Sequence, residues 1–394
     1  MSSVNVGSSR PSERRRSYEF ERAATCRRFV LYTASLGNYF FHEIRDLLAA
    51  GLRELGFSVE MRDEHQGFAP DADWHVVVAP HEFFYLGAGN ELRQQRKPNH
   101  LILLNTEQPS TQWFALARDC FEWAHAIWDI SFESARKISG AGHRCSYLAL
   151  GYSAKCELAK EIPELPDNYG TRSLAAEIKS RSFQNRPFAD RPIDVFFIGH
   201  ASPRREQFFA QSARVLSKHR CYLHFSSAAA PVIPGQTTHM DTPTVMGLAQ
   251  RSRILLNIHH GSDIYFEWHR IVIEGIWQRA LVISEPCGVA PPFTPGLDFI
   301  EAPLEEIPAA IDYHLSTAEG RHEAERIVEH AFRTLTESCR LAHALRKLIL
   351  ALHDAPEFPD GFINGLQADR PQDRGVSHVA GGTLTERARH LADA

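Results

Sequence analysis

The segment that decides the fold of this chain is SRILLNIHHGSDIYFEWHRIVIEGIWQRALVISEP, residues 252–286. Short apolar runs at its two ends flank a loop and an apolar segment of helical length, so the pattern predicts strand, loop, helix and strand. Charged residues nevertheless cluster around the first turn of the predicted helix: Glu267, His269, Arg270 and Glu274. Charges on a helix that is otherwise wrapped in protein need partners, which raises the question of what these side chains bind.

The alternation of short apolar runs with helical segments continues outward in both directions. It is typical of an open parallel sheet with helices on both faces. We therefore predict an α/β fold with two Rossmann-like domains, residues 28–153 and 193–335, whose sheets face each other across a cleft. The runs that predict strands lie at 27–35, 58–64, 73–80, 100–108, 122–131 and 145–152, and then at 193–202, 221–227, 253–260, 280–286 and 296–303.

The remaining segments differ from the two predicted domains in composition. Residues 1–27 are rich in serine and arginine and predict a disordered basic tail. Residues 154–192 are rich in proline and polar residues, as an interdomain linker would be. Residues 336–365 predict a C-terminal helix, and residues 366–394 predict a flexible polar tail.

Composition limits the classes of function. The chain has 394 residues, of which 43% are hydrophobic and 23% charged, and its net charge of −5 gives no support for a nucleic-acid partner. Its seven cysteines include no C-x-x-C pair, which fits a reducing cytosol. No apolar run approaches the roughly 20 residues of a membrane-spanning helix, and we expect no secretory signal. The expected location is cytoplasmic, and the basic tail leaves open a peripheral contact with the inner membrane.

Candidate binding residues follow the predicted strands, because ligands of open parallel sheets lie beyond the carboxyl ends of the strands. The loop after the strand at 193–202 contains Gly199, which allows a close approach of the backbone, and Arg204 and Arg205 would lie in the first turn of the next helix. Cations at a helix N-terminus are disfavoured unless an anion such as a diphosphate docks there. An ordinary exposed basic turn explains these two arginines equally well.

Arg270 and Glu274 are four residues apart, so they share one face of an α-helix, and an intrahelical salt bridge is the simplest explanation. The pair nevertheless comes directly after a strand and a loop, where a carboxylate can accept hydrogen bonds from both hydroxyls of a ribose. His259 and His260 are neighbours on a strand, so their side chains point to opposite faces and do not easily share a metal ion.

The stretch FEWHRIVIEGIWQRALVISEP resembles the nucleotide-sugar half of GT-B glycosyltransferases of the bacterial group-1, GT4-like type. The likeness rests on Arg270, Glu274 and Gly275, and on the apolar run 280–284 that follows. It spans about residues 193–350 and is fainter in the first half of the chain. The resemblance also implies that the final helix packs back toward the first domain, which would bind the acceptor.

The resemblance implies roles for individual residues in binding a nucleotide-diphosphate sugar. Glu274 would bind the nucleotide ribose, and Arg204 or Arg205 would face the diphosphate. The first acid of the family's E-x7-E pattern binds the donor sugar, and its counterpart here, Glu267, stands in an E-x6-E spacing. His260 is a further candidate contact to the donor sugar.

Two patterns that elsewhere indicate ligands are interpreted as structural. The D-x-D sequence at 71–73 directly precedes a strand, so no metal is expected, and no cofactor beyond the donor itself. Arginines and helix N-termini would neutralise the leaving diphosphate instead. Trp113, Trp123, Trp128 and Trp277 are expected in the cores rather than as platforms for sugars.

A catalytic base would come from the first domain. Glu107 follows a predicted strand and is the first candidate, and His42 is the second. Glu43, His81 and Glu82 are rivals. The alternative for Glu107 is a local role, in which its carboxylate only caps the next helix or braces a loop.

The expected function is the transfer of a sugar from a nucleotide-diphosphate sugar to a glycan, a lipid-linked acceptor or a small molecule. Two alternatives stay open. One is a nucleotide-sugar 2-epimerase, which acts on the donor alone. The other is a degenerate GT-B protein without catalysis, serving as a scaffold or a glycan-binding module, which the altered spacing of the two acids favours.

Overall fold

The computed structural model describes residues 28–168, 170–182, 186–226 and 240–353. The predicted tails at 1–27 and 366–394 lie outside these ranges. No helix among the described residues is long and apolar enough to cross a membrane.

The described chain divides into two compact units, each with its own sheet. The first unit runs to residue 148 and also includes residues 153–156 and the segment that begins at Leu341. The second unit contains residues 149–152 and 157–340. The prediction of two α/β domains with parallel sheets is confirmed.

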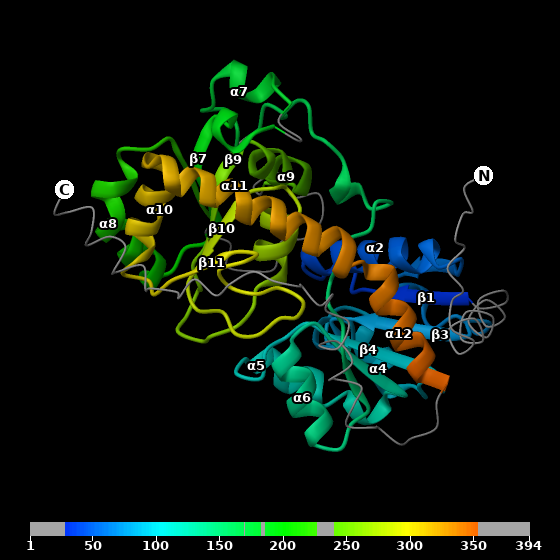
Figure 1. Ribbon diagram of the computed structural model, residues 1–394. Helices are drawn as coiled ribbons and strands as arrows, with labels where there is room; N and C mark the ends of the chain where they lie inside the picture. Colours follow the sequence, from blue (N-terminus) through cyan, green and yellow to red (C-terminus); the bar gives the residue numbers. More distant parts are fainter. Residues whose placement is uncertain (1–27, 169, 183–185, 227–239, 354–394) are drawn as a thin grey trace, which may run out of the picture. The chain divides into compact units, whose positions relative to one another are not determined.

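Six parallel strands form the sheet of the first unit within the described residues, in the order β2-β1-β3-β4-β5-β6 (blue to cyan in Figure 1). Strands β3, β4 and β5 are buried along their whole length, which is why their sequences are continuously apolar instead of alternating. The strands are β1 (Arg28–Tyr32), β2 (Ser58–Arg62), β3 (Trp74–Val78), β4 (Leu101–Asn105), β5 (Ala126–Asp129) and β6 (Cys145–Tyr147).

The helix α2 (Tyr39–Glu54) shows how local sequence sets the ends of an element. Asn38 caps its N-terminus, because Oδ1 of this residue accepts a hydrogen bond from the Phe40 N–H at 3.2 Å. Its C-terminus ends in a Schellman turn in which Gly56 has φ of 89° and the Phe57 N–H donates to the Leu52 carbonyl at 3.1 Å. The other helices of this unit are η1 (Glu64–Gln66), α3 (Pro80–Phe83), α4 (Gly89–Gln94), α5 (Gln112–Arg118), η2 (Phe121–Trp123), α6 (Phe132–Gly140) and α12 (Leu341–His353).

The last described helix, α12, packs against α2 in the first unit (orange beside blue in Figure 1). Gly51 of α2 makes this close packing possible. A Cβ atom at this position would lie 2.8 Å from Cδ1 of Leu345 and 2.9 Å from Cγ of Leu341. The two helices therefore depend on the absence of a side chain at this point.

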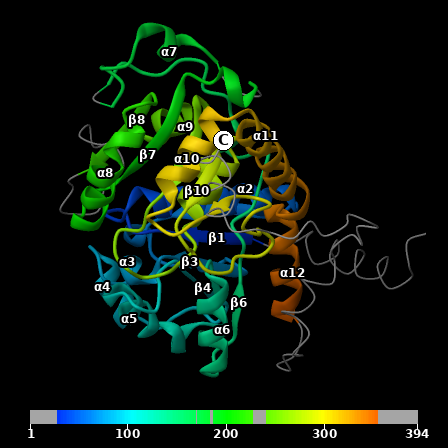
Figure 2. The ribbon, with the colours of Figure 1, turned by 60° about the vertical axis from the view of Figure 1, so that its left-hand side comes forward.

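Five parallel strands form the sheet of the second unit in the described chain, in the order β11-β10-β9-β7-β8. Figure 2 labels β7, β8 and β10 of this sheet. The strands are β7 (Ile193–His200), β8 (Cys221–Ser226), β9 (Ser252–Asn257), β10 (Leu281–Ser284) and β11 (Ile300–Glu301). The helices are η3 (Glu157–Ala159), α7 (Ala176–Ser180), η4 (Phe188–Asp190), α8 (Pro203–Leu216), α9 (Thr242–Gln250), η5 (His269–Ile276), α10 (Ile307–Ser316), α11 (Ala318–Arg333) and η6 (Thr334–Ser338).

Two buried arginines attach the proline-rich residues 157–168, 170–182 and 186–192 to the second unit. The guanidinium of Arg251 donates to the carbonyl oxygens of Ile178 at 2.8 Å and Ile162 at 2.9 Å. Arg191 belongs to the proline-rich segment itself, and its guanidinium donates to the carbonyl of Ser252 at 2.8 Å. The segment therefore packs as part of the second unit.

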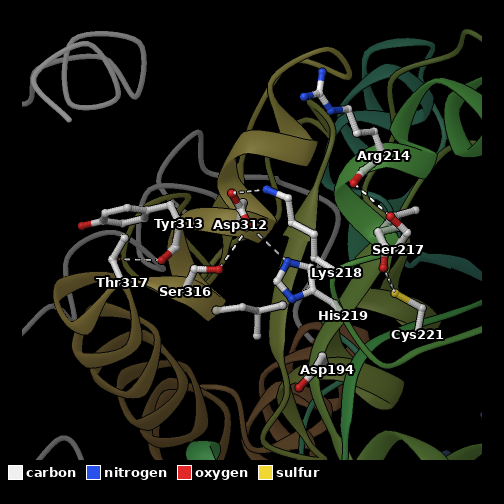
Figure 3. Close-up of polar contacts among 12 residues, drawn as sticks. Asp194, Arg214, Ser217, Lys218, His219, Cys221, Asp312, Tyr313, Ser316 and Thr317 are labelled. Atoms are coloured by element: carbon white, nitrogen blue, oxygen red, sulfur yellow. Dashed lines mark hydrogen bonds and ion pairs between the residues drawn. The ribbon is translucent and has the colours of Figure 1, made fainter. Parts of the chain in front are cut away.

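A polar cluster joins the end of α8 to α10 in the second unit (Figure 3). Asp312 on α10 lies 3.2 Å from Nζ of Lys218 and 3.3 Å from Nε2 of His219. The Ser316 hydroxyl donates to the same carboxylate at 3.1 Å. The cluster fixes the turn that leads into β8.

We expect Gly51→Ala to lower the free energy of unfolding of the first unit by about 1–2 kcal/mol. Alanine is the better helix former, but its Cβ would displace the two leucines of α12. Gly140→Ala is the matched control, because Gly140 ends α6 and a Cβ there meets no atom within 4 Å. Urea denaturation followed by circular dichroism measures both. Equal stability of the two variants would contradict the packing of α12 on α2.

Candidate functional site

The carboxyl ends of three adjacent strands of the second unit, β7, β9 and β10, bring together most of the predicted binding residues. Gly199 and His200 end β7, the loop after β9 contains His259 and His260, and Glu285 directly follows β10. Because parallel strands end at the same edge of a sheet, these segments form one site.

Arg205 is held rigidly at this edge. Its Nε donates to the carbonyl of Ile258 and a terminal nitrogen donates to the carbonyl of His200, each at 2.9 Å. Its guanidinium carbon lies 5.4 Å from the centre of the Phe197 ring. A Cβ on Gly199 would stand 2.7 Å from this guanidinium, so Gly199 makes room for Arg205. Burial, with the nearby charge of Arg270, lowers the pKa of Arg205 to about 10, so it stays positive at neutral pH.

Arg204 makes a bidentate ion pair with Glu285. Glu285 is not among the binding residues predicted from the sequence. One terminal nitrogen of Arg204 donates to Oε1 of Glu285 at 2.8 Å, and the other donates to Oε2. The same carboxylate accepts the backbone N–H of His259. The sequence offers one signal for a binding role of Glu285: it is an acidic residue that directly follows a predicted strand, in the run from 281 to 286.

Arg270, which is buried, and Glu267, whose side chain is 23% exposed, form a charged pair whose capacity for hydrogen bonds is only partly used. A terminal nitrogen of Arg270 donates to Oε1 of Glu267 at 3.4 Å. Burial alone would raise the pKa of Glu267, but the positive charges of Arg270 and Arg205 outweigh it and lower that pKa. Nε and Nη1 of Arg270 and Oε2 of Glu267 are buried and have no hydrogen-bond partner among the described residues.

The helix that carries Arg270 and Glu274 is a π-helix, η5, rather than an α-helix. Its hydrogen bonds include one from the Trp277 N–H to the Val272 carbonyl, five residues back, at 2.8 Å. This wider turn pairs Glu274 with His269, five residues away, with 3.0 Å between Oε1 and Nε2. The ion pair formed by Arg270 in the described chain is with Glu267, so the simple Arg270–Glu274 salt bridge is replaced by two separate pairs.

Glu274 is buried, and only one of its oxygens is engaged. Oε2 has no hydrogen-bond partner within the described ranges. Gly275 lets the helix lie close to β10, because a Cβ there would stand 2.3 Å from a methyl group of Val282. The charge of Glu274 also contributes, after Glu267, to a raised pKa of Arg270, against the lowering effect of burial.

His259 and His260 have different surroundings. His259 is buried, its Nε2 lies 3.0 Å from the carbonyl of Pro286, and its ring centre is 4.6 Å from that of Tyr265. His260 is exposed. The described residues contain no group of three or more histidine, cysteine or acidic side chains that could hold a metal ion.

A second group of titratable residues lies at the carboxyl edge of the first unit. His81 and Glu82 follow β3, and Glu107 follows β4. Nε2 of His81 lies 3.4 Å from Oε1 of Glu107, and the Thr111 hydroxyl donates to Oε2 of Glu107 at 3.2 Å. Oε2 of Glu82 accepts the Asn38 N–H at 2.8 Å.

Burial shifts the pKa values of this second group. It lowers the pKa of His81 to about 3 and raises the pKa of Glu107. Burial, with the nearby charge of Glu107, raises the pKa of Glu82 to about 7. Neutral His81 and two carboxyl groups that hold protons more tightly than usual are a composition suited to proton transfer.

Trp113 lies beside this group, whereas the second candidate base, His42, contacts Thr33. Nδ1 of His42 lies 3.3 Å from the Thr33 hydroxyl, its Nε2 is buried without a partner in the described chain, and burial lowers its pKa. Trp113, expected in the core, is 46% exposed, and its ring centre lies 6.3 Å from that of His81. Trp128 and Trp277 are buried, as expected.

Stability of the first unit is expected to depend on pH through Glu82. The carboxyl group has a pKa of about 7 in the folded chain against an ordinary 4.5, so the folded state binds the extra proton between these values and stability falls as pH rises through this range. Glu82→Gln removes this contribution and reduces the slope. Part of the slope remains in the variant, because burial also raises the pKa of Asp129 to about 7. Urea titrations across this pH range measure the slope, and an unchanged slope in the variant would contradict the protonated state of Glu82.

No protein-family model matches the sequence, and no curated protein matches it either. Solved structures do match. Anabaena HepE in complex with UDP and glucose shares 11% identity over 83% of this chain and 99% of that chain, with a TM-score of 0.51. The same protein in complex with UDP-glucose gives 9% identity, 82% and 99% coverage and a TM-score of 0.51. An α1,3-fucosyltransferase with GDP-fucose shares 12% identity over 85% of this chain and 92% of that chain, with a TM-score of 0.45. Two units with open parallel sheets, matched along nearly the whole of HepE, give this chain the GT-B fold.

Proposed function

We propose that this protein is a glycosyltransferase, of the group-1 type, that moves a hexosyl group from a nucleotide-diphosphate sugar to a glycan, lipid-linked or small-molecule acceptor. The observation that carries the proposal is the half-satisfied charge cluster at the edge of the second sheet. Arg270, Glu267 and Glu274 each bury at least one polar atom that has no partner among the described residues. Such atoms cost roughly 1–3 kcal/mol each unless a ligand satisfies them.

A nucleotide-diphosphate sugar offers the groups that this cluster lacks. Nε and Nη1 of Arg270 supply two donors for a diphosphate oxygen. Oε2 of Glu274 is an acceptor for a ribose hydroxyl, and Oε2 of Glu267 is an acceptor for a hydroxyl of the donor sugar. Arg204 adds positive charge, and Arg205 adds charge while holding the loop after β7. The exposed His260 is assigned to the donor sugar.

The likeness in fold to HepE, which was crystallised with UDP-glucose, supports a donor of this class. We assign no metal ion to the reaction, because in this proposal Arg204, Arg205 and Arg270 would face the leaving diphosphate. Such fixed charges stabilise developing charge without a metal ion. Transfer is therefore expected to proceed at the same rate with and without EDTA.

Nucleotide binding tests the donor site. A calorimetric screen of UDP, GDP and dTDP identifies the nucleotide, and Arg270→Ala is expected to weaken its binding roughly tenfold or more. Arg214→Ala is the matched control, because Arg214 is an exposed arginine on α8 and its removal is expected to leave binding unchanged. Binding of none of the three nucleotides would reject the proposal.

The ribose contact is tested by pairing one change in the protein with one change in the ligand. The unmodified protein is expected to bind the ribonucleotide more tightly than its 2′-deoxy form. Glu274→Gln, which keeps the shape of the side chain, is expected to narrow this difference. This comparison also guards against loss of folding, because a misfolded variant would bind neither ligand.

Transfer kinetics test the base. Glu107 is half-buried beside neutral His81, and we assign it the abstraction of the acceptor proton. Glu107→Gln is expected to lower kcat roughly 100-fold or more while leaving nucleotide affinity unchanged. Glu122→Gln, at a side chain that is 84% exposed, is the control. If Glu107→Gln has no effect, the same assay on Glu82→Gln and His42→Gln identifies the base among the rivals.

The products separate the alternative functions. A sugar released as a glycoside only when acceptor is present supports transfer. An isomerised donor formed without acceptor would indicate a 2-epimerase. Nucleotide binding without turnover on any acceptor would favour a scaffold or a glycan-binding module.

A further inference from the structure

A cavity of about 460 Å³ lies in the first unit at the amino ends of β3 and β4. Its residues come from the segment just before β3, from β3 itself and from the segment just before β4. His81 and Glu107 follow the carboxyl ends of the same two strands, so the cavity is at the opposite edge of the sheet from them. The lining includes Phe68, His75, Arg96, Lys97 and His100, and it includes no acidic residue.

His75 supplies a hydrogen-bond donor to this cavity. The Tyr32 hydroxyl accepts the Ala69 N–H at 3.0 Å and lies 3.0 Å from Nδ1 of His75. A hydroxyl that accepts from Ala69 has its own proton left to donate to Nδ1, which places the imidazole proton on Nε2. Burial lowers the pKa of His75 to about 4, so the ring is neutral at physiological pH. Its Nε2–H has no hydrogen-bond partner in the described part of the chain.

Arg96 supplies an unengaged positive charge. It is exposed, and its guanidinium makes no ion pair or hydrogen bond with the described residues. The neighbouring Lys97 is different, because its ammonium donates to the carbonyls of Arg93 at 2.8 Å and Gln95 at 2.7 Å. Lys97 therefore adds charge, while Arg96 has all the donors of its guanidinium available.

The nearest acidic residues along the chain, Asp71 and Asp73, flank a lining residue but have other partners. The guanidinium of Arg28 pairs with Asp71, and its backbone N–H donates to Asp73 at 2.7 Å. Neither carboxylate pairs with Arg96 or Lys97 in the described chain, so these two cations of the lining keep their charge.

Aromatic rings of His100 and Phe68 line part of the cavity. The His100 ring stacks on Trp74, with ring centres 4.8 Å apart and planes 26° apart, and its Nδ1 lies 3.0 Å from the Asp73 carbonyl. Phe68 packs edge-on against His75. A cavity of this volume accommodates more than an inorganic ion, since pockets of several hundred Å³ hold small organic ligands.

We propose that this cavity binds a small phosphorylated organic molecule, of the size of a sugar phosphate, through the guanidinium of Arg96 and the Nε2–H of His75. The phosphate would lie against Arg96, and the organic part against Phe68 and His100. The site is separate from the donor site and does not depend on the proposed function.

Calorimetry with glucose 6-phosphate, inorganic phosphate and glucose tests the site. We expect glucose 6-phosphate to bind more tightly than inorganic phosphate, and glucose not to bind. Arg96→Ala is expected to weaken glucose 6-phosphate binding roughly tenfold or more, and the fold tolerates the change because the side chain is exposed and unengaged. Arg118→Ala, at an exposed arginine on α5, is the matched control and should leave binding unchanged.

Two further measurements decide where the ligand binds. Imidazole proton signals of His75 and His100 are expected to shift on titration in the full chain and to shift less in Arg96→Ala. Binding that survives Arg96→Ala but is lost in Arg270→Ala would place the phosphate in the second unit and overturn the proposal. Absence of binding by either phosphate would overturn it too, whatever the outcome of the nucleotide screen.

Discussion

Burial of opposite charges at one sheet edge is the constraint on which the second unit depends. Arg205, Arg270 and Glu267 are withdrawn from water, and burial alone would favour their neutral forms. Their arrangement keeps them charged, because each arginine lies near a carboxylate and Arg205 is also bound by two backbone carbonyls. The loop after β7 needs Gly199 to admit that guanidinium. The backbone of this edge is therefore shaped by the charges that it encloses.

The π-helix follows from the same constraint. In an α-helix Arg270 and Glu274 would face each other and satisfy one another, leaving little for a ligand. With the wider turn of η5, Glu274 pairs with His269 and Arg270 pairs with Glu267. Oε2 of each glutamate, and Nε and Nη1 of Arg270, have no hydrogen-bond partner in the described chain. A helix of non-standard pitch at this place keeps charge available, which agrees with the frequent occurrence of π-turns at functional sites.

Much of the fold could be read from the sequence, because its signals are local. Buried parallel strands are continuous apolar runs, Asn38 is a good N-cap, and Gly56 adopts the left-handed conformation that ends α2. Other features could not be read, because they depend on tertiary contacts. The role of Glu285 is recognised only from its ion pair with Arg204, which is 81 residues away in the sequence. Trp113 looked like a core residue, since exposure of a large aromatic side chain has no signature in sequence.

The two sheet edges differ in their electrostatics. At the edge of the second unit, counter-charges hold Arg270 and Glu267 ionised, so these charges are fixed. At the edge of the first unit, burial without a cation raises the pKa of Glu82 to about 7 and raises that of Glu107, so protons there are exchangeable. Each edge obtains its electrostatic property from contacts within its own unit, because the causes of these pKa shifts are residues of the same unit.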